Sequence, residues 1–218
     1  PGAFSGLRTA CAVAQGLAYG AGKPVLALDT LLAVADDARA GRPGWSGWVG
    51  VARRGAVRSL AQRTAGGVSR NIAHQLAVLG VPVQLISVFG NDSDGDWLRQ
   101  VSTKAGVQLD ASIIKEGLSG KYTGILAADG SLFAAFLTNA ANHLITPGHL
   151  QQHRRLLETA SYLMADANIN SDTIEWLLAF SMETGIPFII EPVSVPPARK
   201  LKELTLEGLH LVTPNEDE

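Results

Sequence analysis

The fold of this chain is decided by residues 65–73, which read Ala-Gly-Gly-Val-Ser-Arg-Asn-Ile-Ala and open a predicted helix that ends before Gly80. Two glycines before a helix let the backbone approach a ligand closely, and the first N–H groups of the helix have no partner inside it. A ligand with hydroxyl groups could bind there, because Asn71 can donate and accept hydrogen bonds at once. Taken alone, a Gly-Gly loop is more often only a tight turn. It also lacks the Lys-Ser/Thr ending of a P-loop and the third glycine of a dinucleotide-binding loop.

Strands and helices alternate after this stretch. Predicted strands at 83–89, 162–165, 188–190 and 209–212 are separated by predicted helices at 94–104, 146–160, 173–184 and 198–204. Such connections are right-handed crossovers, which produce a parallel sheet. Asp129-Gly130 joins two further predicted strands, 122–128 and 132–137, into a hairpin. The expected fold class is therefore α/β with an early hairpin.

Polar side chains stand just after three of the predicted parallel strands. They are Asp166 and Asn168, then Glu191 and Ser194, then Asn215 and Glu218. In an open parallel sheet the ligand lies beyond the carboxyl ends of the strands. One such residue alone would be a helix cap, as Asn168 could be, but three strand ends together favour a site. Carboxylate and amide oxygens suit a hydrated Mg²⁺ ion and nucleotide phosphates.

The composition excludes several classes of protein. Hydrophobic residues make up 46% and charged residues 17%, which is the balance of a chain that buries a core. The net charge of -2 gives no electrostatic reason to expect a nucleic-acid-binding protein, because binding to phosphates requires a clustered basic surface. The sequence shows neither a membrane span nor a signal peptide, and the single cysteine, Cys11, fits a reducing cytoplasm. The chain begins at Pro1 rather than Met, so we expect it to be processed, trimmed or partial.

Three motifs together resemble the ribokinase-like, or PfkB-type, carbohydrate kinases over about residues 55–218. They are residues 65–73, residues 88–95 (Val-Phe-Gly-Asn-Asp-Ser-Asp-Gly) and residues 213–218 (Thr-Pro-Asn-Glu-Asp-Glu). Residues 166–168 (Asp-Ala-Asn) and 192–194 (Pro-Val-Ser) are most similar to pseudouridine kinases within that family. The resemblance implies a Rossmann-like fold with a small β lid. It also implies phosphorylation of a nucleoside or sugar hydroxyl with ATP and Mg²⁺, pseudouridine being the best-matching substrate.

The resemblance further implies roles for individual residues. Substrate binding is expected of Gly66, Gly67, Arg70, Asn71, Thr123, Asp166 and Asn168. ATP binding is expected of Glu191, Ser194, Asn215 and Glu218, the last two also organising Mg²⁺ indirectly. Members of the family often form homodimers through the lid, but the hairpin at 122–137 is too ordinary to show it.

The chain departs from the family pattern in three places. The opening strand with its substrate-binding Asp is not recognisable before residue 55, and Glu191 stands where the family usually has Asp. The Gly-Ala-Gly-Asp segment, which supplies the anion hole and the catalytic base, is expected beyond Glu218. We therefore expect that these 218 residues do not turn over substrate. The alternative function is a non-catalytic module that binds a nucleoside.

Residues 1–52 resemble a different family, the actin-like protein of bacterial tRNA threonylcarbamoyladenosine biosynthesis. The resemblance rests on residues 1–8 (Pro-Gly-Ala-Phe-Ser-Gly-Leu-Arg), 14–18 (Ala-Gln-Gly-Leu-Ala), 22–24 (Gly-Lys-Pro) and 29–31 (Asp-Thr-Leu). Its members are partner-binding scaffolds, which gives a further alternative function in tRNA modification. We accordingly expect two units, residues 1–52 and 53–218, with the strongest break at residues 41–47. A fusion, a disrupted reading frame or a misjoined sequence would each explain the join.

Overall fold

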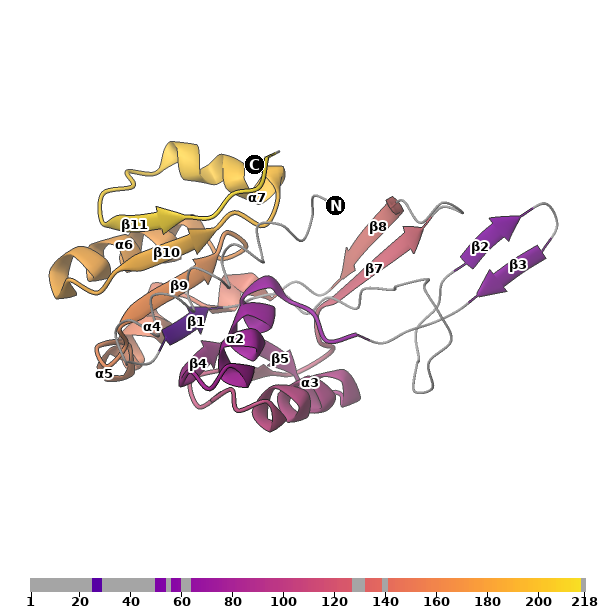
Figure 1. Ribbon diagram of the computed structural model, residues 1–218, viewed down its shortest axis with the longest axis horizontal. Coiled ribbons are helices and arrows are strands. Elements are labelled where there is room, and N and C mark those ends of the chain that lie inside the picture. The colour runs from indigo at the N-terminus through magenta and orange to yellow at the C-terminus, as the bar shows by residue number, and fades with distance from the viewer. Residues whose placement is uncertain are drawn as a thin grey trace.

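The computed structural model describes residues 25–28, 50–53, 56–59, 64–126, 132–138 and 141–216, and it has a parallel sheet at its centre (Figure 1). Five parallel strands pair in the order β11-β10-β9-β1-β4. Their bounds are β1 Val25–Leu28, β4 Val83–Ile86, β9 Tyr162–Asp166, β10 Phe188–Glu191 and β11 Leu209–Val212. The predicted parallel α/β sheet is therefore confirmed.

Helices cover both faces of this sheet. Their bounds are α2 Val68–Val78, α3 Ser93–Lys104, α4 Pro147–Gln152, α5 Arg154–Leu157, α6 Ser171–Thr184 and α7 Val195–Ala198, with 3-10 helices η1 Asn142–Leu144 and η2 Arg199–Glu203. Side chains alternate along a strand, so β9 packs Met164 with the α2 residues and Leu163 with the α6 residues. Strands buried on both faces read as nearly continuous apolar runs, as β9 and β10 do before their final carboxylate residues.

The predicted strand at 83–89 is divided at Ser87. Its first part, β4, belongs to the main sheet, whereas β5 (Val88–Gly90) pairs in parallel with β6 (Ile113–Lys115). Ser112 lies where the partner changes: its Oγ accepts from the Ser87 amide at 3.1 Å and donates to the Leu85 carbonyl at 2.8 Å. A side-chain contact from a residue so far along the chain leaves no local sequence signal.

The predicted helix at 146–160 begins as expected and then breaks. Thr146 caps α4 by accepting a hydrogen bond from the His149 amide at 3.2 Å, and Pro147 takes the first turn. At His153 the backbone turns to φ -104° and ψ 16°, which separates α4 from α5. The predicted helix at 198–204 is likewise shared between α7 and η2.

Two antiparallel hairpins stand off from the α/β layers (Figure 1). The first pairs β7 (Lys121–Leu126) with β8 (Leu132–Thr138) and confirms the predicted hairpin. The second pairs β2 (Gly50–Arg53) with β3 (Ala56–Ser59). Apolar residues at helical spacing predict a helix at 7–19, and Thr30 as an N-cap predicts a second at 30–39; both segments lie outside the described residues.

Strand β1 comes from the segment that resembles the tRNA-modification protein, yet it lies inside the main sheet. Val25 is in register with Val83 of β4 on one side and with Tyr162 of β9 on the other. The short apolar run at residues 25–28 by itself predicts a strand, which is confirmed, and this strand lies inside the sheet between β4 and β9. The division into units 1–52 and 53–218 stays a prediction.

In the part of the chain that the structure describes, every helix is too short or too polar to span a lipid bilayer.

Candidate functional site

The loop at residues 65–67 is shaped by glycine and held by Arg70. Gly67 has φ 100°, a conformation that favours glycine, and both Gly66 and Gly67 are buried. The Arg70 guanidinium donates from Nε to the Gly66 carbonyl at 2.8 Å and from Nη2 to the Ala65 carbonyl at 3.1 Å. Nη2 also donates to Oδ1 of Asn71. Arg70 is only 5% exposed, so it supports the loop from within, and its predicted contact with substrate stays a prediction.

Asp166, at the end of β9, reaches the beginning of α2. Its carboxylate is fully buried; Oδ2 accepts from the Ser69 hydroxyl at 2.9 Å and from the Ser69 amide at 3.4 Å. Oδ1 accepts from the Asn168 amide at 2.9 Å. A negative charge is favourable there because the helix N-terminus carries unpaired N–H groups and a positive partial charge. Gly67 cannot cap α2 with a side chain, so a residue from another element takes that part.

Glu191 lies beside Asp166 on the neighbouring strand. The two residues are in register between β10 and β9, and neighbouring strands lie roughly 4.8 Å apart. Glu191 is 3% exposed, and its Oε2 accepts from the Val193 amide at 2.8 Å. Glutamate, one methylene longer than the aspartate usual in the family, makes this contact with the chain two residues on.

The turn after Glu191 is strained. Val193 has φ 73°, which is uncommon for any residue with a β-carbon and especially for a β-branched one. The Ser194 amide donates to the Pro192 carbonyl at 2.9 Å, closing a three-residue turn. Ser194 itself is exposed at the start of α7. Conformations of this kind cost roughly 1–3 kcal/mol and are found preferentially at functional sites.

The third strand end is that of β11. The Thr213 amide donates to the Ile190 carbonyl at 3.1 Å, which continues the pairing of β11 with β10. The Thr213 side chain is 3% exposed, and its Oγ1 has no hydrogen-bond partner among the described residues. Asn215 is partly buried two residues further on, while Glu218 lies outside the described residues.

The structure therefore brings together most of the predicted site residues. The ends of β9, β10 and β11 adjoin one another, and Asp166 connects them to the Gly-Gly loop. Thr123 is found in β7 opposite Phe136, but its side chain is outside the described part, so its role stays a prediction.

Ser69 and Lys200 were missed by the sequence reasoning. Ser69 lies within residues 65–73 and could have been noticed as a hydroxyl-bearing residue in the first turn of α2. Lys200 donates a hydrogen bond at 2.7 Å to the carbonyl of Ile169, which lies 31 residues earlier in the sequence. A local sequence pattern cannot predict a contact over that separation.

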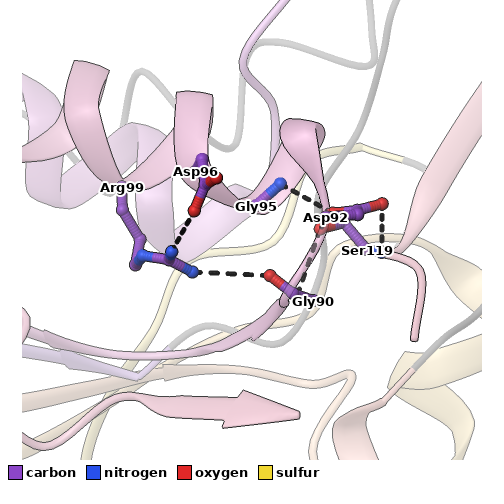
Figure 2. A network of polar contacts seen from close by, with 6 residues as sticks. All are labelled: Gly90, Asp92, Gly95, Asp96, Arg99 and Ser119. Carbon is purple, nitrogen blue, oxygen red and sulfur yellow. Dashed lines mark hydrogen bonds and ion pairs between the residues drawn. The ribbon is translucent and has the colours of Figure 1, made fainter. Parts of the chain in front are cut away.

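A second polar network fastens the base of the β7–β8 hairpin to α3 (Figure 2). Asp92 caps α3 through Oδ1, which accepts from the Gly95 amide at 2.8 Å and from the Ser119 hydroxyl at 2.6 Å, while Oδ2 accepts from the Ser119 amide at 3.0 Å. The Gly90 amide donates to the Ser119 hydroxyl at 3.1 Å. Nearby, Lys121 of β7 pairs with Asp94 at 2.5 Å.

The Asp92 carboxyl group has a pKa below its ordinary value. Burial raises the pKa, but the hydrogen bonds from Ser119 and Gly95 and the charge of Lys121 together lower it by more. The glycines of the motif are required for space. A β-carbon on Gly95 would lie 2.0 Å from the Gly90 carbonyl oxygen, and one on Gly90 would lie 2.4 Å from the Ser119 amide nitrogen. Residues 88–95 therefore build a junction that places the hairpin.

Within the part of the chain that the structure describes, the strand ends offer oxygen ligands but no closed metal cage. Among the described residues, no three His, Cys, Asp or Glu side chains are grouped so as to hold a metal ion. Mg²⁺ does not require such a group, because it keeps several waters and is held through one or two carboxylates and the substrate phosphates. Glu191 and Asn215 provide oxygens of the right kind at the ends of β10 and β11, so the residues present fit a hydrated ion.

Two family models match different parts of the chain. The model described as pfkB family carbohydrate kinase matches residues 58–218. The model described as tRNA N6-adenosine threonylcarbamoyltransferase matches residues 1–71, which fits the resemblance of residues 1–52 only loosely, since that resemblance concerned the non-catalytic protein of the same tRNA modification.

Curated relatives and solved structures agree with the first match. An uncharacterized sugar kinase of Escherichia coli (strain K12) is 35% identical over 69% of this chain and 41% of its own length. The pseudouridine kinase of the same organism is 31% identical over 70% of this chain and 48% of its own length. Ribokinase of Arabidopsis thaliana, solved with ribose and ATP, matches 78% of this chain and 53% of its own with a TM-score of 0.62 and 16% identity, which shows the fold alone.

This chain thus spans less than half the length of the two curated relatives. A kinase model that matches residues 58–218 covers most of it, and the parallel sheet, the Gly-Gly loop and the strand-end residues are those expected of that family. The chain belongs to the pfkB family of carbohydrate kinases.

Proposed function

We propose that this protein is part of an ATP-dependent kinase for a nucleoside or sugar, and that pseudouridine is its substrate. Kinases of this family transfer a phosphoryl group to a sugar hydroxyl. The proposal of pseudouridine is supported by the 31% identity to the Escherichia coli pseudouridine kinase, and the likeness to ribokinases makes free ribose an alternative.

The contact between Asp166 and Ser69 is the observation that carries the proposal. It joins the start of α2, where the Gly66-Gly67 loop lies, to the ends of the parallel strands. Loop and strand ends therefore form one site. Asn71, one turn into α2, would donate and accept hydrogen bonds with ribose hydroxyls. Asn168, whose amide is held by Asp166, would contact the same substrate.

The phosphate side of the site would be formed by Glu191, Ser194, Asn215 and Glu218. Phosphoryl transfer asks the protein mainly for positioning and neutralisation of charge. Mg²⁺ would supply much of that neutralisation, with Asn215 and Glu218 holding it through water. Ser194, exposed at the start of α7, would donate a hydrogen bond to a phosphate oxygen of ATP.

Isothermal titration calorimetry on the 218-residue protein tests the binding step. Pseudouridine is expected to bind, and Asn71→Ala is expected to weaken it by about tenfold or more because the ligand loses a two-way hydrogen bond. The matched control is Gln75→Ala, an exposed residue one turn further along α2. Failure of pseudouridine, uridine and ribose alike to bind wild-type protein would refute the proposed substrate class.

An ADP-release assay on the same protein separates an active kinase from a binding module. Binding without ADP release would agree with our expectation that the Gly-Ala-Gly-Asp segment is needed for turnover. ADP release that depends on pseudouridine would contradict that expectation while supporting the proposed substrate.

The match of residues 1–71 favours a second candidate function, a role in tRNA threonylcarbamoyladenosine modification. In that case the protein would associate with a tRNA threonylcarbamoyltransferase. Co-elution of the two purified proteins in size-exclusion chromatography would support this function, and separate elution would count against it.

A homodimer formed through the lid is also proposed. Phe136 and Leu137 near the end of β8 are 56% and 50% exposed, so each face of the hairpin presents an apolar side chain that a partner could cover. Light scattering should give twice the monomer mass, and Phe136→Ser should reduce it.

A further inference from the structure

Lys200 reaches from η2 back to the loop that follows β9. Its Nζ donates a hydrogen bond to the carbonyl oxygen of Ile169 at 2.7 Å, and the side chain is partly buried. Burial lowers the pKa of the Lys200 ammonium group, and the negative charge of Asp166 offsets part of that effect.

The buried charge of Asp166 gives a physical reason for a lysine at position 200. A fully buried carboxylate is costly unless hydrogen bonds and neighbouring charges stabilise it. Ser69 and the Asn168 amide supply hydrogen bonds, and Lys200 supplies a positive charge. The hydrogen bond from Lys200 to the Ile169 carbonyl also fastens the loop at residues 166–170.

Hydrogen bonds hold the segment between Glu191 and Lys200 at both of its ends. At its beginning, the Glu191 carboxylate accepts from the Val193 amide, and the Glu191 carbonyl accepts from the Ala167 amide at 2.8 Å. At its end, Lys200 binds Ile169. The strained turn at Val193 and the start of α7 lie between these two attachments.

We propose that Lys200 is a positioning residue that holds residues 192–200 against the loop at residues 166–170. It thereby sets the spacing between Asn168 on the proposed nucleoside side and Ser194 on the proposed phosphate side. The inference deepens the proposed function and rests on it for the assignment of those two sides. Lys200 touches neither ligand and acts through the segments that it joins.

Three variants test this role. Lys200→Met removes the charge and the donor at similar length, Lys200→Arg keeps both, and Lys202→Met changes an exposed lysine in the same 3-10 helix. Hydrogen exchange of amides in 166–170 and 193–198 is compared with that in α3 and α6. Lys200→Met should raise exchange in the two segments by about five- to tenfold, the effect of one hydrogen bond, and weaken pseudouridine binding by a similar factor.

Lys200→Arg should restore both values to near those of the wild type, and Lys202→Met should change neither. The inference is overturned if Lys200→Met leaves exchange in both segments unchanged, or if exchange rises equally in α3 and α6, because the lysine would then support the whole fold. Should wild-type protein bind no nucleoside, the proposed function fails, whereas the exchange data still decide whether Lys200 joins the two segments.

Discussion

Replacement of Asp92 by alanine should destabilise the protein substantially, because one carboxylate serves two segments. It caps α3 through the Gly95 amide, and such a cap contributes about 1 kcal/mol. It also accepts from the amide and hydroxyl of Ser119, which is 1% exposed. Buried donors left without partners cost about 1–3 kcal/mol. The expected loss for Asp92→Ala is therefore about 2–4 kcal/mol in the free energy of unfolding.

Urea denaturation followed by circular dichroism measures this loss, and thermal unfolding provides a second reading. For a chain of this size a loss of 2–4 kcal/mol corresponds to a decrease in Tm of roughly 5–15 °C. The matched control is Asp96→Ala in the first turn of the same helix. Its side chain is 62% exposed and pairs with Arg99 at the surface (Figure 2), so its loss should stay below about 1 kcal/mol. Equal losses for the two variants would refute the reasoning.

The pH dependence provides an independent check on Asp92. Its pKa is lowered in the folded protein, so the folded state favours the ionised carboxylate more than the unfolded state does. That contribution is fully present above the unfolded pKa and is lost as the pH falls through the folded pKa. The stability difference between wild type and Asp92→Asn should therefore be constant near neutral pH and shrink in acid below about pH 4. A difference that grew on acidification would contradict the assigned hydrogen bonds.

Three further substitutions have expected outcomes of their own. Gly95→Ala should destabilise by more than about 2 kcal/mol in urea denaturation, because its β-carbon would lie 2.0 Å from the Gly90 carbonyl oxygen; an unchanged midpoint would contradict the close packing. Ala27→Pro should cost about 3 kcal/mol or more in thermal unfolding by removing an N–H from a central strand, whereas Ala27→Ser should be mild; equal Tm values would mean that β1 does not pair with β4 and β9. Val193→Gly should raise the free energy of unfolding, measured by urea denaturation, by up to about 1 kcal/mol by relieving the positive φ, and a clear decrease would show that the valine side chain contributes more than the strain costs.

Local patterns in the sequence were sufficient for much of this architecture. The alternation of apolar strands and amphipathic helices predicted the parallel sheet, and Asp129-Gly130 predicted the β7–β8 hairpin. Thr146-Pro147 predicted the start of α4. These signals work because periodicity, caps and turns depend on neighbouring residues. The strand-end residues were found for a similar reason, since parallel strands present their carboxyl ends at one edge.

The sequence by itself determined the fold class, the Gly-Gly loop before α2 and the polar residues that end β9, β10 and β11. Only the tertiary structure decided how these parts are joined. Asp166 caps a helix 97 residues away, Lys200 fastens a loop 31 residues away, and Ser112 divides a predicted strand at Ser87. Strand β1 likewise finds its place between β4 and β9. Such contacts form between side chains that are far apart in the sequence and meet only after folding, so local sequence patterns cannot predict them.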